Sequence, residues 1–276
     1  MNFLIEGVKF IIYCSAIVLI SKYILVGTIR KLAHHLKLRS KTVGEIAGYA
    51  TSVPELLTVA ASSINGLIGA SMYNILSSNI INFIQYMASI LVNKNQKLLK
   101  NQVIKIDLLL VLGTILLPII FINLNLRLNL LTVVIFIGLY IFFKYIDKNA
   151  HNLYLKEKEN NKNYEKEPKE WGKSIKYILL LIACSILLFV VGDLLGETLE
   201  TLCYRFKIPE IIIGVLLGFI TSIPELITFF ESQKHHKESD NEEEGVIEAT
   251  NNLFTSNILN LFIIQSIGIL IYRILA

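Results

Sequence analysis

The stretch TSVPEL, from Thr51 to Leu56, returns almost unchanged as TSIPEL from Thr221 to Leu226. Both copies place a proline and a glutamate in a chain of 276 residues that is otherwise rich in apolar side chains. Hydrophobic residues make up 54% of the chain, charged residues only 17%, and the mean hydropathy is +0.58. Charged and polar side chains are too few to cover a water-soluble globule of this size. We therefore predict an integral membrane protein.

Long apolar segments recur along the chain, each near the ~20 residues that a membrane-spanning helix requires. They do not alternate apolar with polar residues, as the strands of a membrane barrel would. The expected fold class is an all-α integral membrane protein with about eight transmembrane helices. The expected spans are 8–29, 42–62, 68–92, 104–123, 128–146, 174–196, 208–230 and 247–272.

Basic residues gather in alternate connections between these spans, at 30–41, at 94–105 and in the long polar segment 147–173. The positive-inside rule places all three in the cytoplasm, and strict alternation then places the N-terminus outside. The segment 147–173 is too polar to fold alone and is interpreted as a linker. We expect a multi-pass protein of the plasma (inner) membrane whose first apolar segment is retained, because no small-residue cleavage site follows it.

The similarity between the two halves extends well beyond the opening motif. A shift of 170 positions, from Thr51 to Thr221, aligns residues 8–62 with the second half without a gap. After an eight-residue insertion, NILSSNIIN at 74–82 matches NLFTSNILN at 252–260. This is an internal duplication. We divide the chain into a first repeat at 1–146 (core 42–92), the linker at 147–173 and a second repeat at 174–276 (core 208–272).

Equivalent positions of the two repeats lie on the second and seventh expected helices. The offset of five helices is odd, so the two copies must run in opposite directions through the membrane. Inverted repeats of this kind are a common plan of secondary transporters. The sequence therefore predicts an inverted-repeat transporter bundle.

The repeated prolines should break the helices that carry them. Pro54 has no N–H for the carbonyl of Ala50, and Pro224 likewise leaves the carbonyl of Ile220 free. Such a break is tolerable in lipid only where the freed carbonyls meet protein, water or an ion. Gly48 and Gly218 would let other groups approach this backbone closely.

Two carboxylates, Glu55 and Glu225, should meet at the bilayer centre when the inverted repeats come together. Serine, threonine and asparagine oxygens would surround them, which predicts a site for a hard cation such as Ca²⁺ or Na⁺. A carboxylate in mid-membrane costs at least ~2.5 kcal/mol, which makes two without a ligand hard to explain. The alternatives are Pro-kinked helices whose glutamates snorkel or pair with a basic residue, and serine and asparagine side chains that only bond helix to helix. All five histidines are expected in connections, which argues against zinc or copper as substrate.

The repeated TSxPE and SNxxN blocks resemble the alpha-repeats of the calcium/cation antiporter superfamily, which includes Na⁺/Ca²⁺, K⁺-dependent Na⁺/Ca²⁺ and H⁺/Ca²⁺ exchangers. The resemblance covers both repeats and their topology. It implies that backbone oxygens of Gly48 and Gly218 face the ion. It also implies ion ligation by Thr51, Ser52, Glu55, Ser78, Asn82, Thr221, Ser222, Glu225, Ser256 and Asn260.

This sequence departs from the superfamily's pattern in two ways. Ala50 and Ile220 stand where that pattern has glycine before T-S, and Ser77 and Thr255 where it has glycine before S-N. Members of the superfamily typically have ten helices, whereas the sequence predicts a 5+3 arrangement without the last two. Either eight helices suffice, or a homo-oligomer or partner supplies the missing cover.

The leading functional hypothesis is a secondary antiporter that moves Ca²⁺, or another divalent cation such as Mg²⁺ or Mn²⁺, against Na⁺, K⁺ or H⁺. The first and sixth helices would slide across the four that carry the ligands. The alternative is a truncated, non-transporting relative with a role in assembly or regulation. We expect no enzymatic activity, because no histidine lies near the intramembrane serines to activate one as a nucleophile. The expected partners are membrane lipid and the transported cations, with no nucleic acid and no cofactor.

Overall fold

The computed structural model describes residues 3–28, 31, 38–124, 128–159, 171–237 and 241–275. These residues form helices and their connections, with no β-strand among them. Seven helical stretches in this part are long and apolar enough to cross a membrane. The remaining expected span, 42–62, is a broken helix whose halves, α3 (Ser40–Thr51) and α4 (Val53–Ile64), have 12 residues each. The predicted all-α membrane fold is confirmed.

The other elements follow the expected order along the chain. They are α1 (Phe3–Ile20), η1 (Ser21–Val26), α5 (Ile68–Val92), η2 (Gln96–Lys100), α6 (Gln102–Asn123), α7 (Leu130–Glu159), α8 (Trp171–Glu200), η3 (Thr201–Arg205), α9 (Glu210–Thr221), α10 (Ile223–Lys237), α11 (Glu242–Ile258), η4 (Leu259–Ile264) and α12 (Gln265–Leu275).

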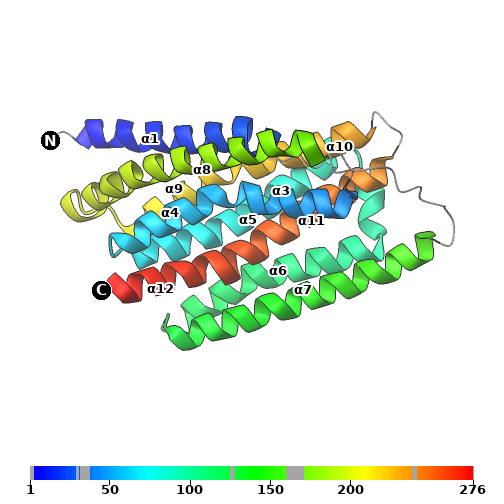
Figure 1. Ribbon diagram of the computed structural model, residues 1–276. Helices are drawn as coiled ribbons and strands as arrows, with labels where there is room; N and C mark the ends of the chain where they lie inside the picture. The colour runs from blue at the N-terminus through cyan, green and yellow to red at the C-terminus, as the bar shows by residue number, and fades with distance from the viewer. Residues whose placement is uncertain are drawn as a thin grey trace.

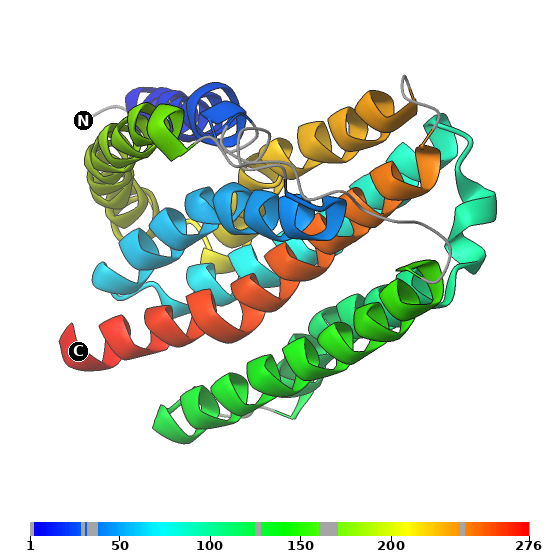
Figure 2. The same cartoon turned by 45° about the vertical axis from the view of Figure 1, so that its right-hand side comes forward.

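The helices form a bundle with two outer pairs. Helices α1 and α8 lie side by side on one side of the bundle, and α6 and α7 lie together on the other (Figures 1 and 2). Between them lie α3, α4, α5, α9, α10, α11 and α12. The central helices carry both repeated motifs, so the fold places these motifs in the interior of the bundle.

The two broken helices run in opposite directions along the bundle (Figure 1). Each one packs against the third helix of the other repeat, α3 on α11 and α9 on α5. The helices are thus exchanged between the repeats, which is the inverted arrangement that the duplication predicts.

Glycine makes these two crossings possible. A Cβ atom on Gly48 would lie 2.8 Å from the carbonyl oxygen of Asn252, and one on Gly218 would lie 2.7 Å from that of Asn74. Real Cβ atoms do not come so close to backbone, so any larger residue would push the helices apart. The close approach expected at both glycines is present.

Both helix breaks fall just before the repeated prolines. Helix α3 ends at Thr51 and α4 begins at Val53, with Ser52 between them. Ser222 separates α9 from α10 in the same way. The break lies within the four residues that end at the proline, because the proline nitrogen cannot donate to the preceding turn.

Two expectations about the connections are wrong. Helix α7 continues to Glu159 and α8 begins at Trp171, so both ends of the segment 147–173 are helical, while 160–170 lies outside the described residues. His151 therefore lies in α7, only 3% exposed, and His236 lies in α10. Partners on other helices hold these polar turns in place, and the sequence of one helix alone does not reveal them.

Candidate cation site

All ten residues that the sequence singled out are buried in the bundle, none more than 2% exposed. The break in each repeat places Thr51, Ser52 and Glu55 on one broken helix and Thr221, Ser222 and Glu225 on the other. Ser78 and Asn82 come from α5, and Ser256 and Asn260 from α11 and η4. Eight of the ten meet in two hydrogen-bonded groups.

The first group is centred on Ser78. Its hydroxyl donates to Glu55 Oε1 at 2.8 Å. The same Ser78 oxygen accepts from Ser222 Oγ and from Asn260 Nδ2, each at 3.3 Å. This group therefore joins the glutamate of the first repeat to side chains of the second.

The second group repeats the first with the halves exchanged. Ser256 donates to Glu225 Oε1 at 3.0 Å. Its oxygen accepts from Ser52 Oγ at 3.1 Å and from Asn82 Nδ2 at 3.4 Å. Each contact of the first group has its counterpart here, so the site has approximate two-fold symmetry.

Several buried oxygen atoms at the site have no hydrogen-bond partner within the described part of the chain. They include Oε2 of Glu55 and Glu225 and Oδ1 of Asn82 and Asn260, four acceptors related by the same symmetry. The hydroxyl of Thr221 also has no partner. In the described ranges no basic side chain pairs with either glutamate. Buried acceptors left open in this way are the groups that a cation binds.

The glycine carbonyls are less open than the superfamily resemblance implies. Gly48 O accepts from Ser52 Oγ at 2.9 Å, and Gly218 O accepts from Ser222 Oγ at 2.7 Å. Both also accept from the backbone nitrogen of the same serine. Cation binding at these carbonyls would require the serine hydroxyls to turn, and it stays a prediction.

The sequence reasoning passed over an asparagine pair at the centre of the symmetry. Asn79 Nδ2 donates to Asn257 O at 3.2 Å, and Asn257 Nδ2 donates to Asn79 O at 3.1 Å. Asn74 and Asn252 likewise donate to Thr58 and Thr228. All of these residues recur between the repeats, so the duplication itself was the signal that could have found them.

The site is not perfectly symmetric. Asn260 lies in the π-helical segment η4, whereas its counterpart Asn82 lies in the regular helix α5. Single π-helical turns inside α-helices occur often at functional sites. The two halves therefore present their asparagines on different backbones.

Inverted repeats that meet around two buried carboxylates define the class of the protein as a secondary membrane transporter. The chain belongs to the sodium/calcium exchanger protein family, whose model matches residues 7–147 and 176–275. No curated protein matches the chain.

Solved structures of the sodium-calcium exchanger NCX_Mj share the fold. With the crystal soaked in 10 mM Na⁺ and zero Ca²⁺, the TM-score is 0.57 at 21% identity, over 98% of this chain and 84% of that one. With 100 mM Na⁺ and 10 mM Sr²⁺, the TM-score is 0.56 at 21% identity, over 98% and 83%. The chain is shorter than these relatives. The family assignment and the inverted-repeat fold expected from the sequence are both confirmed, and the family is one of transporters.

Proposed function

We propose that this chain is a secondary active antiporter that exchanges Ca²⁺, or another divalent cation, for Na⁺ or H⁺ by alternating access. The observation that carries the proposal is the pair of buried glutamates, Glu55 and Glu225, each with one carboxylate oxygen that has no hydrogen-bond partner among the residues that the structure describes. Two carboxylates neutralise one divalent ion, and Ca²⁺ takes about 6–8 oxygen ligands. The proposed ligands are Thr51, Ser52, Glu55, Ser78, Asn82, Thr221, Ser222, Glu225, Ser256 and Asn260.

The energetic cost of the site supports a bound cation. An ionised side chain at the centre of a membrane helix costs about 2.5–3.5 kcal/mol on insertion scales. Glu55 and Glu225 are both 0% exposed, and serine hydroxyls stabilise only one oxygen of each. A bound cation would offset this cost, and its exit would leave the carboxylates to a counter-ion, which is what exchange requires.

A cavity of about 150 Å³ lies between α4 and α8, beside the helix that carries Glu55. Its lining on α4 runs from Leu57 to Asn65, on the face of the helix that is turned away from Glu55. Two exposed acidic residues of α8, Asp193 and Glu197, line it as well. A negative lining would attract cations to this mouth of the pathway.

The contact between α4 and α8 has small residues where sliding would occur. Gly196 of α8 lies against Ala61, and Gly192 lies against Leu57. Small side chains give a smooth surface with little interdigitation, so α8 and its partner α1 could shift along the bundle. Such a shift would open the site to one side of the membrane and then to the other.

The face of α9 that corresponds to the α7-binding face of α3 is exposed and apolar. Lys41, Glu45 and Tyr49 of α3 contact α7, whereas their counterparts on α9 are Ile211, Val215 and Phe219, all exposed. Apolar side chains facing outward suit contact with lipid. We expect lipid here, and a second copy of the chain remains an alternative for the same face.

Uptake of radioactive Ca²⁺ into proteoliposomes, driven by an outward gradient of Na⁺, K⁺ or H⁺, tests the proposal. We expect uptake that depends on one of these gradients and stops when it is dissipated. A folded protein that binds Ca²⁺ in detergent but shows no gradient-driven flux would favour the alternative of a non-transporting relative.

A further inference from the structure

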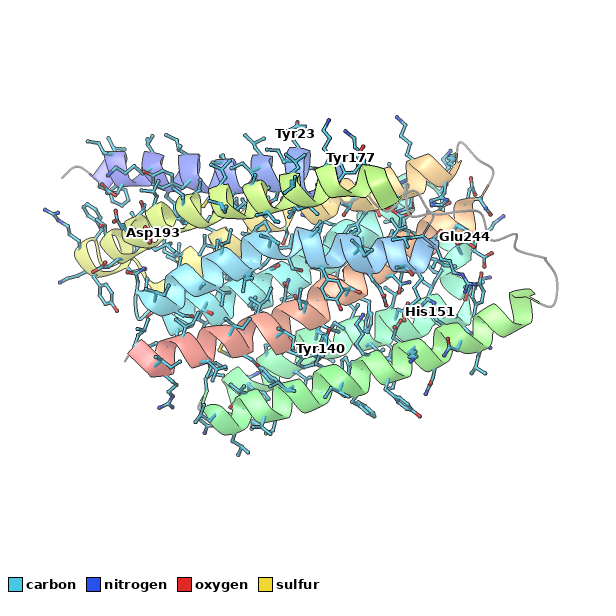
Figure 3. The ribbon with its side chains drawn as sticks, in the orientation of Figure 1. Tyr23, Tyr140, His151, Tyr177, Asp193 and Glu244 are labelled. Atoms are coloured by element: carbon cyan, nitrogen blue, oxygen red, sulfur yellow. The ribbon has the colours of Figure 1, made fainter. Side chains whose placement is uncertain are left out.

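A second cluster of buried charged side chains lies apart from the glutamate site. Asp107 of α6 and Asp147 and His151 of α7 are all buried, and one ligand atom of each lies within 4.8 Å of the others. His151 lies toward the end of the bundle opposite Asp193 (Figure 3). Nothing in the proposed transport mechanism uses this cluster.

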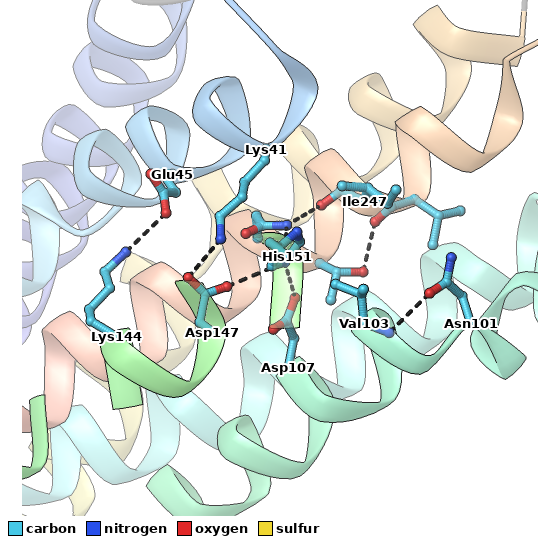
Figure 4. Close-up of polar contacts among 12 residues, drawn as sticks. Lys41, Glu45, Asn101, Val103, Asp107, Lys144, Asp147, His151 and Ile247 are labelled. Carbon is cyan, nitrogen blue, oxygen red and sulfur yellow. Dashed lines mark hydrogen bonds and ion pairs between the residues drawn. The ribbon is translucent and has the colours of Figure 1, made fainter. Parts of the chain in front are cut away.

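Three polar side chains lie close to one atom of the cluster. His151 Nε2 lies 3.0 Å from Asp107 Oδ2 and 3.3 Å from Asp147 Oδ1, which are both acceptors (Figure 4). The amide nitrogen of Asn251, a donor, lies 3.5 Å from the same Nε2. The amide also donates to Ile247 O at 2.9 Å, so a protonated Nε2 would leave it satisfied, whereas an unprotonated Nε2 would turn its lone pair toward two carboxylates.

Unpartnered acceptors point to a missing ligand. Asp107 Oδ1 and Asn251 Oδ1 are buried and accept no hydrogen bond from the described part of the chain. Lys41 donates to Asp147 Oδ2 at 2.8 Å and so leaves the other oxygen of Asp147 facing the imidazole. Two carboxylates and one lysine ammonium leave a net charge of −1 beside a neutral imidazole, which a bound cation would offset.

The spacing of the cluster allows a metal ion, and its donor set indicates which class of metal ion fits. Ligands about 2.1 Å from a tetrahedral zinc ion lie about 3.4 Å apart. The separations of 3.0 Å and 3.3 Å from His151 Nε2 to the two aspartates are close to that value. Imidazole with two carboxylates is a donor set that first-row transition metals accept.

We propose that Asp107, Asp147 and His151 form a binding site for a divalent first-row transition-metal ion such as Zn²⁺ or Co²⁺, separate from the transport site. Asn251 stands beside the site as the nearest further polar group. A bound ion would join α6 to α7 beside Asn251 of α11. The next residue of α11, Asn252, accepts a hydrogen bond from the hydroxyl of Thr51. Lys41 competes with the ion for Asp147 and is 21% exposed, so it marks the side from which the ion enters.

Titration with Co²⁺ tests the proposal, because bound Co²⁺ is detected by its visible spectrum and not by transport. The protein is the full chain in detergent, without a histidine tag, and it carries Glu55→Gln and Glu225→Gln to remove the charge of the transport site. We expect one Co²⁺ per chain with a spectrum typical of nitrogen and oxygen ligands, and competition by Zn²⁺. Absence of stoichiometric binding would overturn the proposal. The cluster would then be an ion-pair network in which a proton, and not a metal ion, lies between the histidine and the carboxylates.

Three further variants in the same background separate the site from other histidines. His151→Gln should weaken Co²⁺ binding at least about tenfold, since the only nitrogen ligand is lost. The control His236→Gln, at a histidine that pairs with Glu248 at 3.1 Å, should bind as before. Lys41→Met should tighten binding by about tenfold, because it removes a positive charge beside the ion. Unchanged affinity in His151→Gln, or weaker affinity in a folded Lys41→Met, would contradict the assignment.

Discussion

Ser78 donates a hydrogen bond of 2.8 Å to Oε1 of Glu55, and this bond orients a carboxylate that is 0% exposed. The other oxygen, Oε2, accepts no hydrogen bond from the described part of the protein. Ser256 and Glu225 repeat the relationship at 3.0 Å. Each glutamate thus has one oxygen held by a serine and one left open, which is the arrangement expected of the cation ligands proposed above.

The charge of each glutamate should be essential for transport. Glu55→Gln and Glu225→Gln preserve volume but leave one carboxylate to face a divalent cation, so we expect gradient-driven Ca²⁺ flux to fall to background in either variant. Flux into proteoliposomes and monodispersity in detergent are measured together. Glu200→Gln, on the exposed surface of α8, is the control and should transport normally. Wild-type flux in either site variant would refute the assignment of the site.

The serines should affect apparent affinity more than folding. A hydrogen bond to a charged group contributes about 1.5–3 kcal/mol, so Ser78→Ala or Ser256→Ala should raise the apparent Michaelis constant for Ca²⁺ about tenfold or more. Thr114→Ala removes a buried hydroxyl that donates only to the backbone of α6, and it should leave the constant unchanged. Equal effects of the site and control variants would mean that the serines act only through general packing.

The helix crossings should be intolerant of any side chain at the glycines that recur in both repeats. Gly48→Ala places a Cβ 2.8 Å from Asn252 O, and the overpacking should lower stability by about 1–3 kcal/mol. Gly138→Ala, in α7 with open space around it, should instead stabilise the protein by up to about 1 kcal/mol. Thermal unfolding in detergent measures both. A Gly48→Ala variant as stable as Gly138→Ala would show that the crossing is looser than the structure has it.

The acidic mouth of the cavity between α4 and α8 should concentrate cations. Neutralising Asp193 and Glu197 with asparagine and glutamine should raise the apparent Michaelis constant for Ca²⁺ added from that side at low ionic strength. The maximal rate should not change, and high salt should remove the difference because it screens exposed charges. If the two proteins behave alike at low ionic strength, the cavity is not on the route of the ion.

The predicted topology can be tested with single cysteines. After replacement of Cys14, Cys184 and Cys203 by alanine, cysteines introduced at Asn2 and Asn160 should react with a membrane-impermeant reagent from opposite sides. The N-terminus is expected outside and the segment around Asn160 inside. Labelling of both positions from one side would contradict the orientation derived from the basic residues.

Much of the fold could be predicted from local chemistry. Apolar length fixes which segments can cross a bilayer, and a proline fixes where a helix breaks, because neither effect depends on neighbours. The repeat of Glu55 as Glu225 was enough to predict opposed helices and a site between them. The polar turn of α7 around His151 was missed because its stability depends on Asp107 of α6 and Lys41 of α3.

The sequence by itself determined the membrane fold and its inverted duplication, since these follow from hydropathy and repetition, and its resemblance to the antiporter superfamily implied the ten residues of the candidate site. Only the tertiary structure decided which oxygens of that site are held and which are open, because each serine bonds across helices that the sequence does not pair. It also decided that Asp107, Asp147 and His151 meet. These residues lie on two helices and have no repeated counterpart, so only the packing of α6 against α7 brings their side chains within reach of one ion.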